Sequence, residues 1–152
     1  MNQNPATVLP STVHEIMEVN FFGVIQTTVT LLPLMRKHKN GGAIVNVTSM
    51  MGSNSFLANT TESFNSSPLH LFSGYGSSKA ALNSYTITLS HELKAEGIKV
   101  NAVTPGLTST KMSGQTGKTV TSGAAALLPW ALLEKDGPTG TCPKPAANVL
   151  GG

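Results

Sequence analysis

Residues 43–48 of the chain read AIVNVT, a nearly continuous apolar run rich in β-branched residues. Such a run is typical of a strand that is covered on both faces, as in a parallel sheet. A second run of this kind, IKVNAVT, covers residues 98–104 and is followed directly by Pro105 and Gly106. The sequence therefore predicts two short buried strands separated by about fifty residues.

Helical periodicity precedes, separates and follows these strands. Apolar residues recur at steps of three and four over residues 12–37 and again over residues 74–96, where Gly97 is expected to close the helix. A third helix is expected near residues 120–135. The order helix, strand, helix, strand, helix predicts a parallel α/β architecture, in which residues 43–104 form one crossover unit.

Three segments are predicted to lie outside these elements. Residues 50–73 are rich in Asn, Ser and Thr and are expected to form a long inserted loop. Residues 107–119 are expected to be mobile and to act as a substrate lid, and residues 137–152 to be a weakly structured tail rich in Pro and Gly. With 152 residues, the chain is expected to form a single domain over positions 1–152.

Composition excludes several classes of protein. Hydrophobic residues make up 39% and charged residues 11%, which excludes a disordered chain. The ten Lys and Arg are scattered, without the basic stripe of a nucleic-acid surface. The single Cys142 and the four histidines show no metal-ligand spacing, so no metal is expected. The sequence shows no signal segment and no apolar run near the length of about 20 residues that a membrane span needs. A cytoplasmic location without membrane partners is therefore expected.

The stretch YGSSK places Tyr75 and Lys79 four residues apart, on one face of the predicted helix. A nearby ammonium favours the phenolate, so we expect Lys79 to lower the pKa of Tyr75 from its ordinary value near 10. Ser49 ends the first strand, and its hydroxyl can donate to an oxygen on which negative charge develops. Asn20 interrupts an apolar helix face, where a buried amide needs a helix kink or an ordered water.

Each of these features also has a simpler explanation. A tyrosine can merely pack while a lysine four residues later is solvated, and a strand-end serine often satisfies backbone groups. An asparagine on an apolar face is often structural. What favours a shared site is that ligands of open parallel sheets bind beyond the carboxyl ends of the strands. All these stretches are expected to meet at that edge.

The order of the motifs resembles the short-chain dehydrogenase/reductase family, and its carbonyl-reductase-like members in particular. The similar stretches are EVNFFGVIQTT, GAIVNVTSMMG, SSKAALNSYTITLSHEL and GIKVNAVTPG, followed by GAAALLPWALL and DGPTG. They cover residues 8–141 and occur in the family's order. The resemblance implies the carboxyl-terminal half of a Rossmann-like, doubly wound parallel sheet with helices on both faces. It also implies an oxidoreductase that moves hydride between NAD(P)(H), with NADP(H) the expected form, and a small-molecule carbonyl or alcohol.

The resemblance also implies roles for individual residues. Tyr75 would exchange a proton with the substrate oxygen, and Lys79 would lower its pKa and hold the nicotinamide ribose. Ser49 would hydrogen-bond the substrate oxygen, and Asn20 would hold a water in the proton relay. The residues implied to line the nicotinamide pocket are Pro105, Gly106, Thr108 and Thr110. A homo-oligomer is possible within this family.

The sequence departs from the family at its amino end, where no glycine-rich turn follows a strand. Because that turn binds the cofactor's phosphates, we expect a truncated family domain that binds the dinucleotide weakly. The alternative is a non-catalytic remnant that acts by associating with a partner chain, for example through the strand edge at residues 43–48. QTGKT at residues 115–119 mimics the end of a phosphate-binding loop, but Met112 stands where that motif requires its first glycine.

Overall fold

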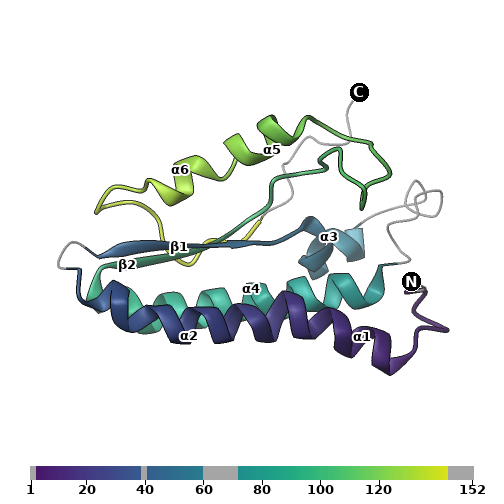
Figure 1. Ribbon diagram of the computed structural model, residues 1–152, viewed down its shortest axis with the longest axis horizontal. Coiled ribbons are helices and arrows are strands. Elements are labelled where there is room, and N and C mark those ends of the chain that lie inside the picture. The colour runs from purple at the N-terminus through teal and green to yellow at the C-terminus, as the bar shows by residue number, and fades with distance from the viewer. Residues whose placement is uncertain (1–2, 39–40, 60–71, 144–152) are drawn as a thin grey trace.

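The computed structural model describes residues 3–38, 41–59 and 72–143 of the chain (Figure 1). At its centre lie two parallel strands, β1 (Gly42–Val47) and β2 (Ile98–Val103), in register from Gly42 with Ile98 to Val47 with Val103. Figure 1 shows α1, α2 and α4 on one face of these strands and α5 and α6 on the other. The predicted α/β class, with a parallel sheet and helices on both faces, is confirmed.

The first helix is continuous from residue 10 to residue 36, close to the predicted range. It comprises α1 (Pro10–Met17), a π-helical turn, η1 (Glu18–Phe22), and α2 (Gly23–Arg36). By length and composition alone it could cross a membrane, so the expectation that no segment is long enough is too strong. Core helices of water-soluble proteins meet the same criterion. In this structure α1 and η1 pack against α4.

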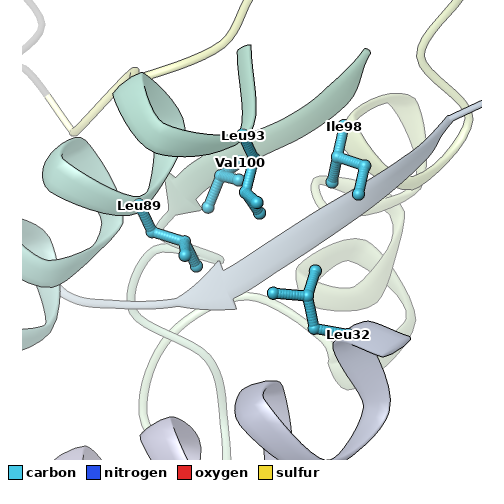
Figure 2. Packing of buried hydrophobic residues seen from close by; sticks show 5 residues of the cluster. All are labelled: Leu32, Leu89, Leu93, Ile98 and Val100. Atoms are coloured by element: carbon cyan, nitrogen blue, oxygen red, sulfur yellow. The ribbon is translucent and has the colours of Figure 1, made fainter. Parts of the chain in front are cut away.

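The second long helix, α4 (Ser73–Leu93), connects the two strands. It continues into a 3₁₀ turn, η5 (Lys94–Glu96), and ends at Gly97, whose φ of 72° is the left-handed conformation that the sequence predicts for this cap. Leucines of α4 pack on the strands to form the core (Figure 2), which comprises Leu32, Leu89, Leu93, Ile98 and Val100.

Two segments differ from their predicted structure. The segment 50–73 is not a plain loop, because Met50–Gly52 forms a 3₁₀ turn, η2, and Asn54–Asn59 forms a short helix, α3; residues 60–71 lie outside the described residues. The predicted helix at 120–135 is two short helices, α5 (Val120–Ala125) and α6 (Leu128–Ala131). Pro129 stands in the first turn of α6, where a helix best tolerates its missing N–H, so a new helix begins at this point.

The tail is also more ordered than predicted where it is described. Residues 138–141 follow the outer edge of β2, where Gly140 N donates to Val100 O (2.8 Å) and Ala102 N donates to Thr141 O (2.9 Å). The prediction of a weakly structured tail is therefore wrong for these residues, and residues 144–152 lie outside the described part.

The opposite edge of the sheet is open. Among the described residues, β1 pairs only with β2. A cavity of about 750 Å³ lies between α2 and β1, and its walls include Val24, Leu31, Ile44 and Leu82. Asn20 and Lys79 also line it, so the cavity reaches the residues that the sequence singles out.

Candidate active site

The structure brings Ser49 and Tyr75 together. Ser49 directly follows β1 and caps η2, where its Oγ accepts from Met51 N (3.2 Å). Tyr75 is half-buried in the first turn of α4. Ser49 lies near enough to the Tyr75 hydroxyl to lower its pKa. Two hydroxyls, one after a strand end and one at a helix start, thus lie near each other.

Close backbone packing brings these two hydroxyls together. A Cβ added to Gly52 would lie 2.6 Å from the carbonyl carbon of Lys79, and one added to Gly76 would lie 2.9 Å from Met51 O. Real Cβ atoms do not approach so closely, so η2 rests directly on the backbone of α4 only because both positions are glycine. Asn83 reinforces the contact, because its Nδ2 donates to Gly52 O (3.1 Å).

Lys79 lies beside the tyrosine, one helical turn along α4. Its Nζ is 5.6 Å from the centre of the Tyr75 ring and donates to Val47 O (3.0 Å) at the end of β1. The side chain therefore crosses from the helix to the sheet edge and faces the cavity between α2 and β1.

The pKa of Tyr75 moves in the opposite direction from the one the sequence predicts. Burial raises it above 10, and the nearby Ser49 hydroxyl offsets only part of this increase. Burial also lowers the pKa of Lys79 below its ordinary value. The prediction that Lys79 lowers the pKa of Tyr75 is therefore wrong for this structure. Tyr75 keeps its proton at neutral pH, which suits a proton donor rather than a base.

Asn20 reaches the tyrosine through an intermediate residue. It lies in the π-helical turn η1, and its Nδ2 donates to Ser78 Oγ (3.1 Å), which in turn donates to Tyr75 O (2.7 Å). The sequence predicted a helix kink or an ordered water at Asn20, and the π-helical turn is an irregularity of the first kind. Ser78 is fully buried and links Asn20 to the catalytic helix, a role that the sequence analysis missed. Its place three residues after Tyr75 was the available signal, since such residues share a helix face.

The other predicted residues form a separate cluster at the end of β2. Gly106 has a φ of 75°, and its carbonyl accepts from Thr108 Oγ1 (3.1 Å). Thr110 N donates to Ser113 Oγ (2.9 Å) within the next turn. Thr48 N donates to Val103 O (2.9 Å), which holds the ends of the two strands together. Pro105 follows the end of β2 by two residues, as Ser49 follows the end of β1, so both lie at the same edge of the sheet.

The predicted lid at residues 107–119 is a folded loop. Lys118 N donates to Leu107 O (3.1 Å), and Ser109 N donates to Lys118 O (2.9 Å). Gly117 permits this closure, because its φ is 107° and a Cβ there would lie 2.5 Å from Leu107 O. This explains the Gly-Lys-Thr stretch without a bound phosphate.

The residues present fit one end of a nicotinamide dinucleotide. The Tyr75 hydroxyl and the Lys79 ammonium are donors suited to ribose hydroxyls, and the turn after β2 offers exposed backbone. Within the described ranges, neither strand leads into a glycine-rich turn that could hold the phosphates. The same ranges hold no group of three His, Cys, Asp or Glu placed to bind a metal.

Comparisons with known proteins agree with this architecture. The family model described as short chain dehydrogenase matches residues 2–121. The chain is 37% identical over 122 residues to 17-beta-hydroxysteroid dehydrogenase type 2 of Homo sapiens, a match that covers 80% of this chain and 25% of the relative.

Solved structures show the same fold. Salutaridine reductase of Papaver somniferum superposes with a TM-score of 0.69 at 28% identity, covering 85% of this chain and 53% of that one. Carbonyl reductase Sniffer of D. melanogaster, at 23% identity, has the same TM-score over 88% of this chain and 54% of its own. The chain thus spans a quarter to about half the length of these relatives. The matched motifs and the shared fold lead to one conclusion: this chain belongs to the short chain dehydrogenase family.

Proposed function

We propose that the chain carries the proton-transfer half of an NAD(P)H-dependent carbonyl reductase, with Tyr75 as the proton donor. The observation that carries this proposal is that the Ser49 and Tyr75 hydroxyls lie near each other at the edge of the parallel sheet. A carbonyl oxygen placed against both hydroxyls would receive two hydrogen bonds, which stabilise the negative charge that develops on it.

The raised pKa of Tyr75 sets the direction of its chemistry. Because burial keeps the phenol protonated, it can give its proton to an alkoxide-like oxygen as that charge develops. Lys79 holds a positive charge beside the ring. The attraction between this charge and the tyrosine becomes stronger when the phenol ionises. A nicotinamide dinucleotide, when bound, supplies the hydride to the carbonyl carbon.

Asn20 and Lys79 are proposed to share a proton path. Both line the cavity beside β1, and a hydrogen bond from Asn20 to Ser78, which bonds the main-chain carbonyl of Tyr75, holds Asn20 beside the first turn of α4. A water held between them would connect the site with solvent. NADP(H) and a cytoplasmic location belong to the proposal as the sequence favours them, and a small carbonyl substrate is the class that the name of the similar carbonyl reductase Sniffer indicates.

The second candidate is a remnant that associates with a partner chain without catalysis. It is favoured by the unpaired edge of β1 and by the absence of a phosphate-binding turn among the described residues. The two candidates differ in one property, because only the first requires the Tyr75 hydroxyl.

Reduction of a panel of aldehydes and ketones by the purified chain with NADPH or NADH tests the proposal. We expect Tyr75→Phe to lower turnover by about 10²- to 10⁴-fold, the usual contribution of a positioned proton donor. Tyr85→Phe is the matched control, because Tyr85 lies in the same helix, packs on the core and is the only other tyrosine.

Equal turnover in the wild-type chain and Tyr75→Phe would exclude Tyr75 as the donor. Absence of both turnover and cofactor binding in a folded wild-type chain would instead favour the remnant.

A further inference from the structure

A residue from the amino-terminal segment of the chain stabilises the first turn of α4. The first N–H groups of a helix have no partner within the helix, and here the N-cap residue, Phe72, makes no side-chain cap. Gln3 takes that place. Its Oε1 accepts from Tyr75 N (2.8 Å), and its carbonyl oxygen accepts from both the amide and the hydroxyl of Ser73.

We propose that Gln3 is a positioning residue for Tyr75, which by capping the first turn of α4 keeps the phenol against Ser49. This inference rests on the proposed function, in which Tyr75 donates the proton.

The position of Tyr75 in its helix makes the cap consequential. Tyr75 is the third residue of α4, within the turn that opens first when a helix frays. Ser49 is held independently, by β1 and by its bond from Met51 N. The two hydroxyls therefore stay together only while the first turn of α4 is formed, and small errors in placement are costly to catalysis.

The packing around the cap agrees with this role. A Cβ added to Gly74 would lie 3.1 Å from Ile16 Cδ1 and 3.4 Å from Gln3 Oε1. The glycine thus lets α1 and Gln3 approach the turn together. Gln3 is 72 positions away from Tyr75 in the chain, so the contact forms only when the amino-terminal segment is folded onto α4.

Two substitutions separate the acceptor from the bulk of the side chain. Gln3→Met keeps the length but removes the acceptor, whereas Gln3→Glu keeps an acceptor oxygen. Gln26→Met is the matched control, because Gln26 is exposed and bonds only Thr30 in its own helix. All variants carry Tyr85→Phe, which leaves Tyr75 as the sole tyrosine and allows its phenol to be titrated by ultraviolet absorbance without any cofactor.

In Gln3→Met we expect amide exchange at Tyr75 to become about tenfold faster, which corresponds to the loss of one hydrogen bond, whereas the Ser73 amide keeps its main-chain acceptor. The pKa of Tyr75 should fall toward 10, because the ring leaves its buried position. Gln3→Glu should retain slow exchange and the raised pKa, and Gln26→Met should match the parent. A general loss of stability would not move the pKa of Tyr75 in the folded state.

Unchanged exchange and an unchanged phenol titration in a folded Gln3→Met variant would overturn the inference, as would equal effects of Gln3→Met and Gln3→Glu. If Gln3→Met does not fold, amide exchange in the parent Tyr85→Phe chain provides the test. Fast exchange of the Tyr75 amide in that chain would show that Gln3 does not cap the helix. These readouts do not depend on turnover. An active Tyr75→Phe enzyme would refute the proposed function without altering them.

Discussion

The helices α4 and α2 cover the same face of the sheet but bury their apolar residues to very different extents. On α4, Leu82 and Leu93 are 1% and 0% exposed, and side chains of this helix pack on β2 and form hydrogen bonds with β1. On α2, only Leu32 among the leucines is buried, while Leu31 and Leu34 remain 48% and 60% exposed. The cavity beside β1 lies under α2.

The difference shows which residues of the candidate site lie on a well-packed helix and which lie beside a partly exposed one. Tyr75 and Lys79 lie on α4, which buries its core-facing leucines, and the buried side-chain polar atoms of the described residues are paired. Asn20 lies in η1, which leads directly into α2. A longer relative has chain available to cover α2, since the match spans only about half of the solved structures.

The largest expected effect comes from paired leucine truncations. Leu93→Ala should lower the free energy of unfolding by about 2–5 kcal/mol, because it leaves a cavity in the closed core. Leu34→Ala should change it by less than about 0.5 kcal/mol, as an exposed substitution. Urea denaturation measures both. Similar losses of stability in the two variants would mean that Leu34 is buried in solution, and that α2 and α4 do not differ in burial as the structure shows.

A smaller effect is expected from the buried polar contacts of α4. Thr86 Oγ1 accepts from Asn46 Nδ2 (2.8 Å) and donates to Leu82 O (2.8 Å). Thr86→Val keeps the shape but strands the amide of Asn46, at a cost of roughly 1–3 kcal/mol. Thr88→Val is the control, because its hydroxyl bonds only its own helix at an exposed position. Equal costs would contradict a paired, closed interface.

The smallest effect concerns the ion pair that ties α2 to the end of α4. Arg36 donates two hydrogen bonds to Glu96, both of 2.7 Å, and these hold the pKa of Glu96 below 4.5. The pair therefore stabilises the fold above that pH, and the stabilisation is lost as the pH falls through the lowered pKa. Both Glu96→Gln and Arg36→Met should show a flatter decline of stability in acid, detected by thermal unfolding across that range. An unchanged acid profile would mean that the exposed pair contributes nothing.

Local patterns predicted the elements of the fold and the residues of the site that belong to motifs. The runs at 43–48 and 98–104 could be assigned because their β-branched residues and terminal turns leave few alternatives. Gly97 could be assigned because a helix end that needs a positive φ selects glycine. YGSSK and Ser49 stood out by chemistry and by place at the sheet edge.

What the sequence did not reveal depends on contacts between distant residues. The pKa of Tyr75 is set by burial, which no spacing of Tyr75 and Lys79 encodes. Gln3 could not be linked to α4, since nothing in a polar amino-terminal stretch indicates its acceptor. The tail at residues 138–141 looked unstructured because its order comes from the edge of β2, not from its own propensity.

The parallel pairing of β1 with β2 also bears on how the chain folds. Gly42 meets Ile98 only after the whole intervening segment has returned along the sheet, so closing this pair has a large entropic cost that short-range contacts do not repay. The serine and the phenol both belong to the first part of that crossover, since Ser49 follows β1 and Tyr75 lies in the first turn of α4, so the two side chains meet only when α4 is packed against the end of β1. The appearance of a raised tyrosine titration during refolding would therefore report the docking of α4 on β1 and not the formation of α4 alone.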